Sequence, residues 1–238
     1  MLKNNETFDT SVKNLEATWG KTLLSYAKIL ASCVAVRLTG SRDAEELYEF
    51  HIRDSLYSVP LLPEAPADKG DSKVIDVGSG GGLPGMVWAI CRPDLRVTLL
   101  DSARKKCDAL REIAAELDLK NVSIVWERCE DHALSAREHY AFASARALAH
   151  TGVLAEYLSP LVAQGGSLAA FKGPKGPEEL REVGSVWNTL GLSEPRILRY
   201  GSEERSYAFV LWEKIAPCPR SYPRKSGMAL SKFWWQRG

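Results

Sequence analysis

The chain has 238 residues, 45% of them hydrophobic and 26% charged, enough length and apolar content for a full globular core. No apolar run approaches the roughly 20 residues of a membrane span, and the polar N-terminus lacks a signal-peptide core, so we expect a cytoplasmic protein without membrane attachment. Five scattered cysteines and four histidines form no ligand spacing, so we expect no metal site and reduced thiols. The net charge of +1 conceals an uneven distribution, because every charged residue from Lys214 onward is basic.

The first part of the chain is predicted to be helical. Apolar residues recur at helical spacing over 15–36, a second helix is expected to begin at a cap provided by Ser41 or Asp43, and a third is expected over 53–62. Several prolines follow as a linker. We therefore predict a small helical lobe over residues 1–70.

From Lys73 onward, strands alternate with helices. The expected strands are 73–77, 96–101, 122–126, 141–145 and 166–171, and the expected helices begin after Pro84 and cover 104–118, 152–163 and 177–190. Residues 195–200 and 206–212 are expected to form a closing hairpin around the turn G-S-E-E-R. The alternation predicts an α/β fold with a doubly wound, mostly parallel Rossmann-like sheet over 71–213. With a terminal antiparallel hairpin, this is the architecture of class I S-adenosylmethionine-dependent methyltransferases.

The stretch D-V-G-S-G-G-G-L-P-G follows the first of these strands. Gly78, Gly80 and Gly82 form a G-x-G-x-G run after Asp76, while a second frame that ends at Gly85 gives the dinucleotide pattern. A dinucleotide loop presents N–H groups to a pyrophosphate, and a carboxylate there is a poor neighbour. Asp76 instead suits the cationic end of S-adenosylmethionine, so we expect this cofactor, with a ligand-free turn as the alternative.

Two further strand ends fit the same cofactor. Asp101 ends the second strand, where a carboxylate can accept from both ribose hydroxyls; it could also cap the next helix, and the two roles can coexist. Cys129 and Glu130 follow the third strand, where the backbone can meet the adenine edge and Cys129 can cover its face. The alternative for this segment is a plain junction between strand and turn.

The chain resembles the RsmG family of bacterial small-subunit rRNA methyltransferases, also called glucose-inhibited division protein B. The matching motifs are D-V-G-S-G-G-G-L-P-G, L-L-D-S-A-R-K-K, H-I-R-D-S-L, A-R-A-L-A, F-K-G, E-R-S-Y-A-F-V and Y-P-R-K. The resemblance implies N7-methylation of one guanine in the decoding-site loop of 16S rRNA by a monomer. It also implies that Gly78, Leu83, the Cys129–Glu130 backbone and Arg146 bind the cofactor. The chain departs from the family at Arg37, where Asn is usual, and after Y-P-R-K, where S-G-M-A-L replaces P-G-T-P-N.

Guanine N7 carries a free lone pair, so methyl transfer to it needs no general base, and catalysis is expected to come from placement and electrostatics. Arg146 and Lys172 each end an apolar strand and are the expected catalytic residues, since a cation there can hold the guanine O6 or a phosphate. The alternatives are a surface charge at a helix start for Arg146 and a solvated loop residue for Lys172.

The expected RNA contacts lie at both ends of the chain. His51 and Arg53 are expected to frame the cleft from the helical lobe, although His51 could equally be a structural histidine. Lys105 adds charge near the strand ends. The tail, 214–238, mixes cations with aromatic residues, as RNA-binding segments do, and Arg220, Arg224 and Lys225 are its candidates. A disordered basic end is the alternative.

The expected partner is 16S rRNA, the small ribosomal subunit or an assembly intermediate. One rival is a methyltransferase that acts on a small molecule or another RNA, which would not need the basic tail. A non-catalytic RNA-binding module would be expected to have a degraded glycine loop, and this loop is complete. An NAD-dependent oxidoreductase is disfavoured by Asp76.

Overall fold

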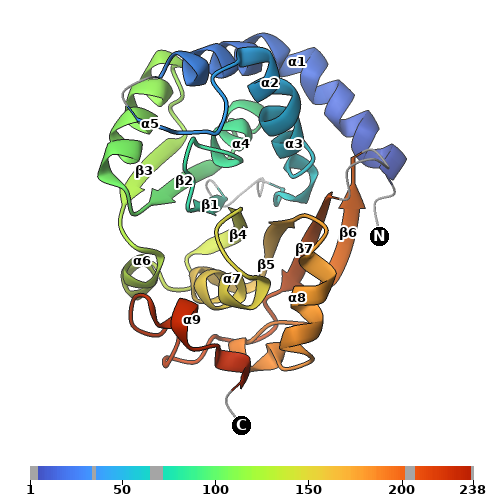
Figure 1. The fold of residues 1–238 in the computed structure, drawn as a ribbon, viewed down its shortest axis with the longest axis vertical. Coiled ribbons are helices and arrows are strands. Elements are labelled where there is room, and N and C mark those ends of the chain that lie inside the picture. Colours follow the sequence, from blue (N-terminus) through green and yellow to red (C-terminus); the bar gives the residue numbers. More distant parts are fainter. Residues whose placement is uncertain (1–4, 34–35, 65–71, 202–206, 237–238) are drawn as a thin grey trace. The chain divides into compact units, whose positions relative to one another are not determined.

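The structure, a computed structural model, describes residues 5–33, 36–64, 72–201 and 207–236. It divides into two compact units, Met1–Trp126 and Glu127–Gly238. In Figure 1 the first unit runs from the blue helix α1 to the green strand β3, and the second continues to the red C-terminal segment. The turn predicted between the hairpin strands and much of the predicted proline linker lie outside the described residues.

The first unit opens with helices, as predicted. Helix α1 is longer than expected, Asn5–Ser32, and buries Phe8, Leu23 and Tyr26. The remaining helical segments are α2 (Ala44–Leu47), the π-helical turn η1 (Tyr48–Ile52), α3 (Arg53–Leu56) and the 3-10 turn η2 (Val59–Leu61). Of the two predicted caps, Asp43 occupies the N-cap position, because its Oδ1 accepts from the Glu46 N–H at 2.8 Å. The second and third predicted helices are one continuous helical segment.

The sheet of the first unit is parallel, in the order β3-β2-β1. Its strands are β1 (Lys73–Val77), β2 (Arg96–Asp101) and β3 (Val122–Trp126), and its helices are α4 (Gly85–Cys91) and α5 (Arg104–Glu116). Every residue of α4 is buried. In register, Asp101 pairs with Trp126, so the glycine loop, Asp101 and Trp126 all lie at the carboxyl edge of this sheet.

The second unit contains β4 (Tyr140–Arg146) and β5 (Val162–Lys172) in parallel, then β7 (Tyr207–Glu213) and β6 (Arg196–Tyr200) as an antiparallel hairpin, in the order β4-β5-β7-β6. The predicted hairpin strands are therefore confirmed. Its helical segments are α6 (Cys129–Ser135), α7 (Thr151–Leu158), η3 (Ser159–Leu161), α8 (Gly176–Val183) and η4 (Trp187–Leu190).

Two predicted helices of this unit are wrong in extent. The helix predicted to reach 163 gives way to β5 at Val162, and the helix predicted over 177–190 stops at Gly184, whose φ of 71° breaks the helical path.

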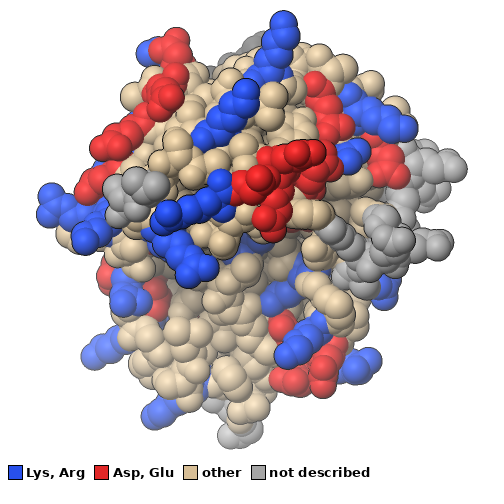
Figure 2. Space-filling view, turned by 45° about the horizontal axis from the view of Figure 1, so that its top comes forward, with Lys and Arg blue, Asp and Glu red and all other residues tan. Residues whose placement is uncertain are grey.

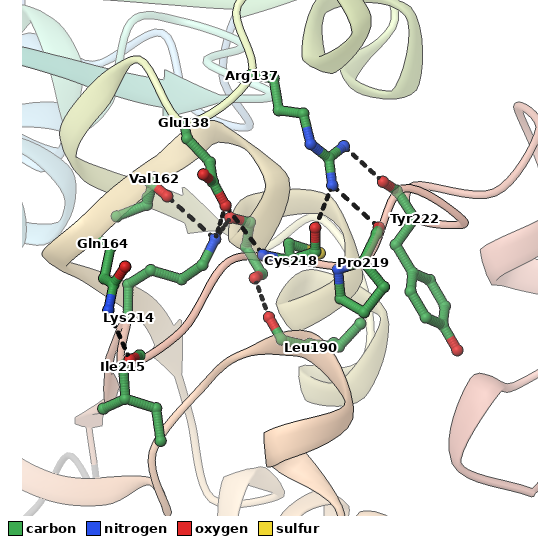
Figure 3. A network of polar contacts seen from close by, with 11 residues as sticks. Arg137, Glu138, Val162, Gln164, Leu190, Lys214, Ile215, Cys218, Pro219 and Tyr222 are labelled. Carbon is green, nitrogen blue, oxygen red and sulfur yellow. Dashed lines mark hydrogen bonds and ion pairs between the residues drawn. The ribbon is translucent and has the colours of Figure 1, made fainter.

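The basic tail folds onto the second unit and starts at a buried lysine (Figure 3). The Nζ of Lys214 donates to the Glu138 carboxylate at 3.1 Å and to the carbonyl oxygens of Ser159 and Val162 at 2.6 and 3.1 Å. Burial lowers the pKa of Lys214, and the Glu138 carboxylate opposes that effect. All three ammonium protons therefore have acceptors, as a buried cation requires.

Further contacts hold the rest of the tail. Arg137 donates to the carbonyl oxygens of Cys218, Pro219 and Tyr222 (Figure 3). Beyond them lie the short helix α9 (Met228–Ser231) and the 3-10 turn η5 (Trp234–Gln236), where the Trp234 indole donates to Gly152 O at 2.8 Å. The alternative of a disordered basic end is wrong for the described tail, because its residues pack against α6 and α7.

Candidate cofactor-binding and catalytic site

The glycine loop after β1 is held in a conformation that favours glycine. Gly78, Gly80 and Gly82 have φ values of 72°, 57° and 85°, which side chains rarely adopt. The N–H groups of Gly78 and Ser79 both donate to Leu100 O, and the Tyr26 hydroxyl donates to Gly81 O at 2.5 Å. A Cβ on Gly80 would have no neighbour closer than 3.9 Å, so the backbone conformation, not crowding, favours glycine at this position.

Asp76 is fully buried, and its Oδ2 accepts from the Gly85 N–H at 3.1 Å. A Cβ on Gly85 would lie 2.1 Å from Leu99 Cδ2, so Gly85 is required where α4 packs on the strands. This packing explains the last glycine of the dinucleotide-like frame without a ligand. Leu83, which is also expected to bind the cofactor, is buried.

Asp101 joins the glycine loop to the end of β2. Its Oδ2 accepts from the Gly80 N–H at 2.9 Å and its Oδ1 from the Ala103 N–H at 2.8 Å. The second contact lies ahead of α5, whose N-cap position is Ala103 and has no side-chain hydrogen bond, so the alternative that Asp101 caps this helix is wrong. Each carboxylate oxygen can accept more than one hydrogen bond, which leaves acceptor capacity for ribose hydroxyls.

The second unit places Cys129 and Glu130 at the first turn of α6. Cys129 is buried, its thiol donates to Tyr157 O at 3.3 Å, and burial raises the pKa of the thiol far above its usual value. Cys129 therefore stays a neutral thiol, which does not suit a nucleophile. The Glu130 carboxylate accepts from the Gly227 N–H at 2.9 Å, so it ties the tail to this segment.

The two predicted catalytic cations end neighbouring strands. Arg146 is the last residue of β4, half-buried, and pairs in register with Phe171, the residue before Lys172. Ala147 follows with a φ of 53°, an uncommon conformation that turns the chain sharply after Arg146.

Lys172 is engaged within the unit. Its side chain is only 9% exposed, and its Nζ lies 2.7 Å from both Ala149 O and the Glu179 carboxylate. Glu179 also accepts from the Thr151 N–H and hydroxyl, at 2.7 and 2.5 Å. These bonds fix the segment from Ala147 to Thr151, so Lys172 positions the chain that follows Arg146. A direct contact of Lys172 with substrate stays a prediction.

Glu179 is a site residue that the sequence does not reveal. Burial alone would raise the pKa of Glu179, but the hydrogen bonds from Lys172 and Thr151 outweigh that effect and lower the pKa. The residue follows Pro177 in a glutamate pair at a helix start, a position where acids are common for helical reasons alone. Only the tertiary contacts distinguish Glu179 from Glu178.

The RNA-binding candidates differ in availability. Lys105, Arg220 and Lys225 are exposed, while Arg53 contacts Glu16 and Glu49 at 3.4 and 3.1 Å. His51 is half-buried within η1.

Arg224 is buried, and its guanidinium forms two hydrogen bonds with the Glu156 carboxylate, at 2.8 and 2.6 Å. The structure therefore uses Arg224 to anchor the tail on α7. Basic and acidic side chains alternate over the face drawn in Figure 2, so charge alone does not mark an RNA surface there.

Within 5–33, 36–64, 72–201 and 207–236, no cluster of three or more His, Cys, Asp or Glu side chains is arranged to hold a metal ion. No helix in the same ranges is both long and apolar enough to cross a membrane.

The glycine loop after β1, the carboxylate at the end of β2 and the antiparallel strand β7 beside a parallel strand define a class I S-adenosylmethionine-dependent methyltransferase. The fold agrees with the crystal structure of the antibiotic-resistance methyltransferase Kmr, with a TM-score of 0.50 and 18% identity over 62% of this chain and 89% of that one.

The model of the family described as rRNA small subunit methyltransferase G matches residues 20–207, and the chain belongs to this family. The degree of similarity is shown by two relatives, each named ribosomal RNA small subunit methyltransferase G. The one from Petrotoga mobilis is 36% identical over 81% of this chain and 86% of its own length. The one from Moorella thermoacetica is 37% identical over 83% of this chain and 82% of its own length.

Proposed function

We propose that this protein transfers the methyl group of S-adenosylmethionine to N7 of one guanine in the decoding-site loop of 16S rRNA. The observation that carries the cofactor assignment is the Gly80–Asp101 contact, which sets the glycine turn beside a carboxylate at the carboxyl edge of the first sheet. The rRNA substrate is supported by the relatives, which are named as methyltransferases of the small-subunit ribosomal RNA.

The residues of the chain fit this cofactor. The acceptor capacity of Asp101 suits the ribose hydroxyls, and the glycines of the loop 78–82 let the backbone approach the cofactor closely. The Cys129–Glu130 backbone suits the adenine edge. When bound, S-adenosylmethionine supplies an electrophilic methyl group on a sulfonium.

The proposed contribution of the protein to catalysis is to position the target guanine against the methyl group of the cofactor. N7 needs no proton removed, and the neutral Cys129 thiol, whose pKa burial raises, is not required as a nucleophile. Arg146 supplies a positive charge at a strand end, where a guanidinium can hold the guanine O6 or a phosphate. Glu179 and Lys172 hold the segment after Arg146.

The finer parts of the assignment are proposals as well. The protein acts as a cytoplasmic monomer on 16S rRNA, the small subunit or an assembly intermediate. A helical lobe over 1–70 and a tail over 214–238 flank the methyltransferase domain, 71–213. Exposed cations, including Lys105, Arg220 and Lys225, contact the RNA, together with His51 and Arg53.

The test uses tritiated S-adenosylmethionine, small ribosomal subunits that lack this modification, and digestion of the rRNA to nucleosides. Label in 7-methylguanosine is expected. Label in another nucleoside would contradict the N7 assignment, and label that enters only small molecules would favour the alternative substrate class.

A paired variant tests Arg146. Arg146→Ala is expected to keep the fold, read by circular dichroism, and to lose turnover or cofactor affinity. Arg181→Ala, an exposed arginine on α8, is the matched control and should keep both. Unchanged methylation kinetics in Arg146→Ala would remove the proposed role.

A further inference from the structure

Trp126 is a large aromatic side chain that is partly exposed to solvent at the carboxyl edge of the first sheet. It ends β3 and is 51% exposed. Its indole N–H donates to Ser102 O at 3.0 Å, which fixes the ring against the chain that leaves β2. A fixed, half-exposed indole presents its π face without the entropy cost of ordering a mobile side chain.

A guanidinium lies over this ring. Arg104 Cζ is 5.2 Å from the centroid of the Trp126 ring, within the range of a cation–π contact. The Arg104 side chain remains 71% exposed, and its contact with Asp108 is long, at 3.9 Å. Because the carboxylate does not hold it closely, most of the guanidinium is available to a further partner.

The pair lies beside the expected cofactor site. Trp126 is the register partner of Asp101, whose carboxylate holds the glycine loop through Gly80. Exposed Lys105 follows Arg104 on the first turn of α5. Neither the packing of the unit nor the proposed chemistry requires an exposed indole here.

We propose that Trp126 and Arg104 form a stacking platform for an unpaired base of the substrate RNA, close to the methyl donor. Aromatic faces and guanidinium planes stack on splayed-out bases, and Lys105 supplies a cation for the adjoining phosphate. A protein partner is disfavoured, because the exposed indole lies against a guanidinium, whereas the core of a protein interface is depleted of charged residues. This inference rests on the proposed RNA substrate.

The binding test uses the full chain and a decoding-loop RNA oligonucleotide, and it requires no methyl transfer. The chain has seven tryptophans, so the signal of Trp126 is isolated as the difference between the wild type and Trp126→Phe. We expect RNA to quench that difference signal. An unchanged difference signal at saturating RNA, when binding is confirmed by a second method, would overturn the platform, and so would the absence of any RNA binding.

The second test measures affinity. Trp126→Ala is expected to weaken RNA binding about 5- to 150-fold, the range for removal of one stacked base, and to leave S-adenosylmethionine binding unchanged. Arg104→Lys, which keeps the charge without the planar group, should weaken RNA binding in the same direction, and Trp126→Phe should retain most of the affinity. The controls are Leu24→Ala, an exposed apolar residue, and Lys120→Ala, an exposed cation.

The outcomes of these tests distinguish the proposed stacking platform from the proposed methylation of guanine N7. RNA affinity within twofold of the wild type in Trp126→Ala would overturn the platform even if 7-methylguanosine forms. Tight RNA binding that depends on Trp126, without label in guanosine, would support the platform and contradict the proposed reaction. An equal loss of cofactor and RNA affinity would show that Trp126 serves the fold of the site, and would also overturn the platform.

Discussion

At the scale of single residues, Gly82 shows why the loop sequence is restricted. Its φ is 85°, and an added Cβ would lie 2.6 Å from Met86 Cγ and 2.9 Å from the Tyr26 hydroxyl. The backbone conformation and the available space thus exclude a side chain for separate reasons.

Gly82→Ala is therefore expected to destabilise the protein by about 1–3 kcal/mol and to weaken S-adenosylmethionine binding, measured by denaturant unfolding and calorimetric titration. Two controls separate the causes. Gly165→Ala has the same φ of 85° with open space, and Gly40→Ala has open space without that φ. If Gly82→Ala lowered the free energy of unfolding no more than Gly165→Ala does, crowding by Met86 and Tyr26 would not contribute to the loss of stability.

Glu179 carries a prediction that depends on pH. Because the pKa of its folded-state carboxyl lies below the ordinary value of 4.5, its contribution to stability is present above that value and is lost as pH falls through the folded-state pKa. Glu179→Gln should remove this acid-side loss and should lower turnover with little change in the KM for RNA. The measurements are unfolding midpoints between about pH 5 and 3 and steady-state kinetics.

The neighbouring variant Glu178→Gln serves as the control, since Glu178 is exposed on the same helix turn. Equal behaviour of the two variants would contradict the positioning role of Glu179.

The sequence predicts the position of some candidate residues and not of others. Asp101 is expected beside the glycine loop because it ends the second strand, and its contact with the Gly80 N–H agrees with that position. Its role in ribose binding stays a prediction. Glu179 and the Trp126–Arg104 contact depend on residues brought together from separate elements, so no local pattern marks them. For Arg224 the sequence suggests a role that the structure does not support. It is a candidate RNA contact because it lies in a basic tail, but its guanidinium is buried against Glu156.

At the scale of elements, apolar runs and turn residues predict the strands and their order along the chain. They mislead at the start of β5, where the strand is predicted from Gly166 but begins at Val162. There β4 shifts register against β5 between Tyr140 and Phe142, and a Cβ on Gly166 would lie 2.6 Å from Ala141 O. An irregular, glycine-containing strand of this kind accommodates a close backbone approach, which a single sequence does not reveal.

For the tail, the structure predicts how much stability is lost when the buried Lys214 is replaced. Lys214→Met leaves the half-buried Glu138 carboxylate without its cation and the carbonyl oxygens of Ser159 and Val162 without this donor. Each buried polar group left unsatisfied costs about 1–3 kcal/mol. Denaturant unfolding of Lys214→Met should show a decrease in stability of this size.

Arg196→Ala is the matched control, because the Arg196–Glu213 pair, at 3.0 Å, is more than half exposed. Removal of an exposed pair costs about 0–1 kcal/mol. A similar small cost for both variants would contradict the anchoring role of Lys214.

At the scale of the whole molecule, the tail cations within the described residues 214–236 divide into two groups. Lys214 and Arg224 are buried and paired, so deletion of the tail would test stability as much as RNA binding. Arg220, Lys225 and Lys232 are exposed, and these three are the ones to test for RNA contact.

The triple variant with glutamine at positions 220, 225 and 232 is expected to weaken RNA binding and to flatten its salt dependence. The slope of log K against log salt should fall by about 0.7 for each phosphate that the protein no longer neutralises. The control triple replaces the exposed cations Lys13, Lys28 and Lys120. An unchanged slope in the tail variant would show that the exposed tail does not bind the RNA backbone.

The most direct test of the account is the number and position of methyl groups that the wild-type protein adds to 16S rRNA. With excess S-adenosylmethionine and unmodified small subunits, incorporation should reach a plateau of one methyl group per rRNA molecule. That group should be a 7-methylguanosine, mapped by site-specific chain cleavage to the decoding-site loop. A plateau near zero, several modified sites, or a methyl group on any atom other than guanine N7 would contradict the account.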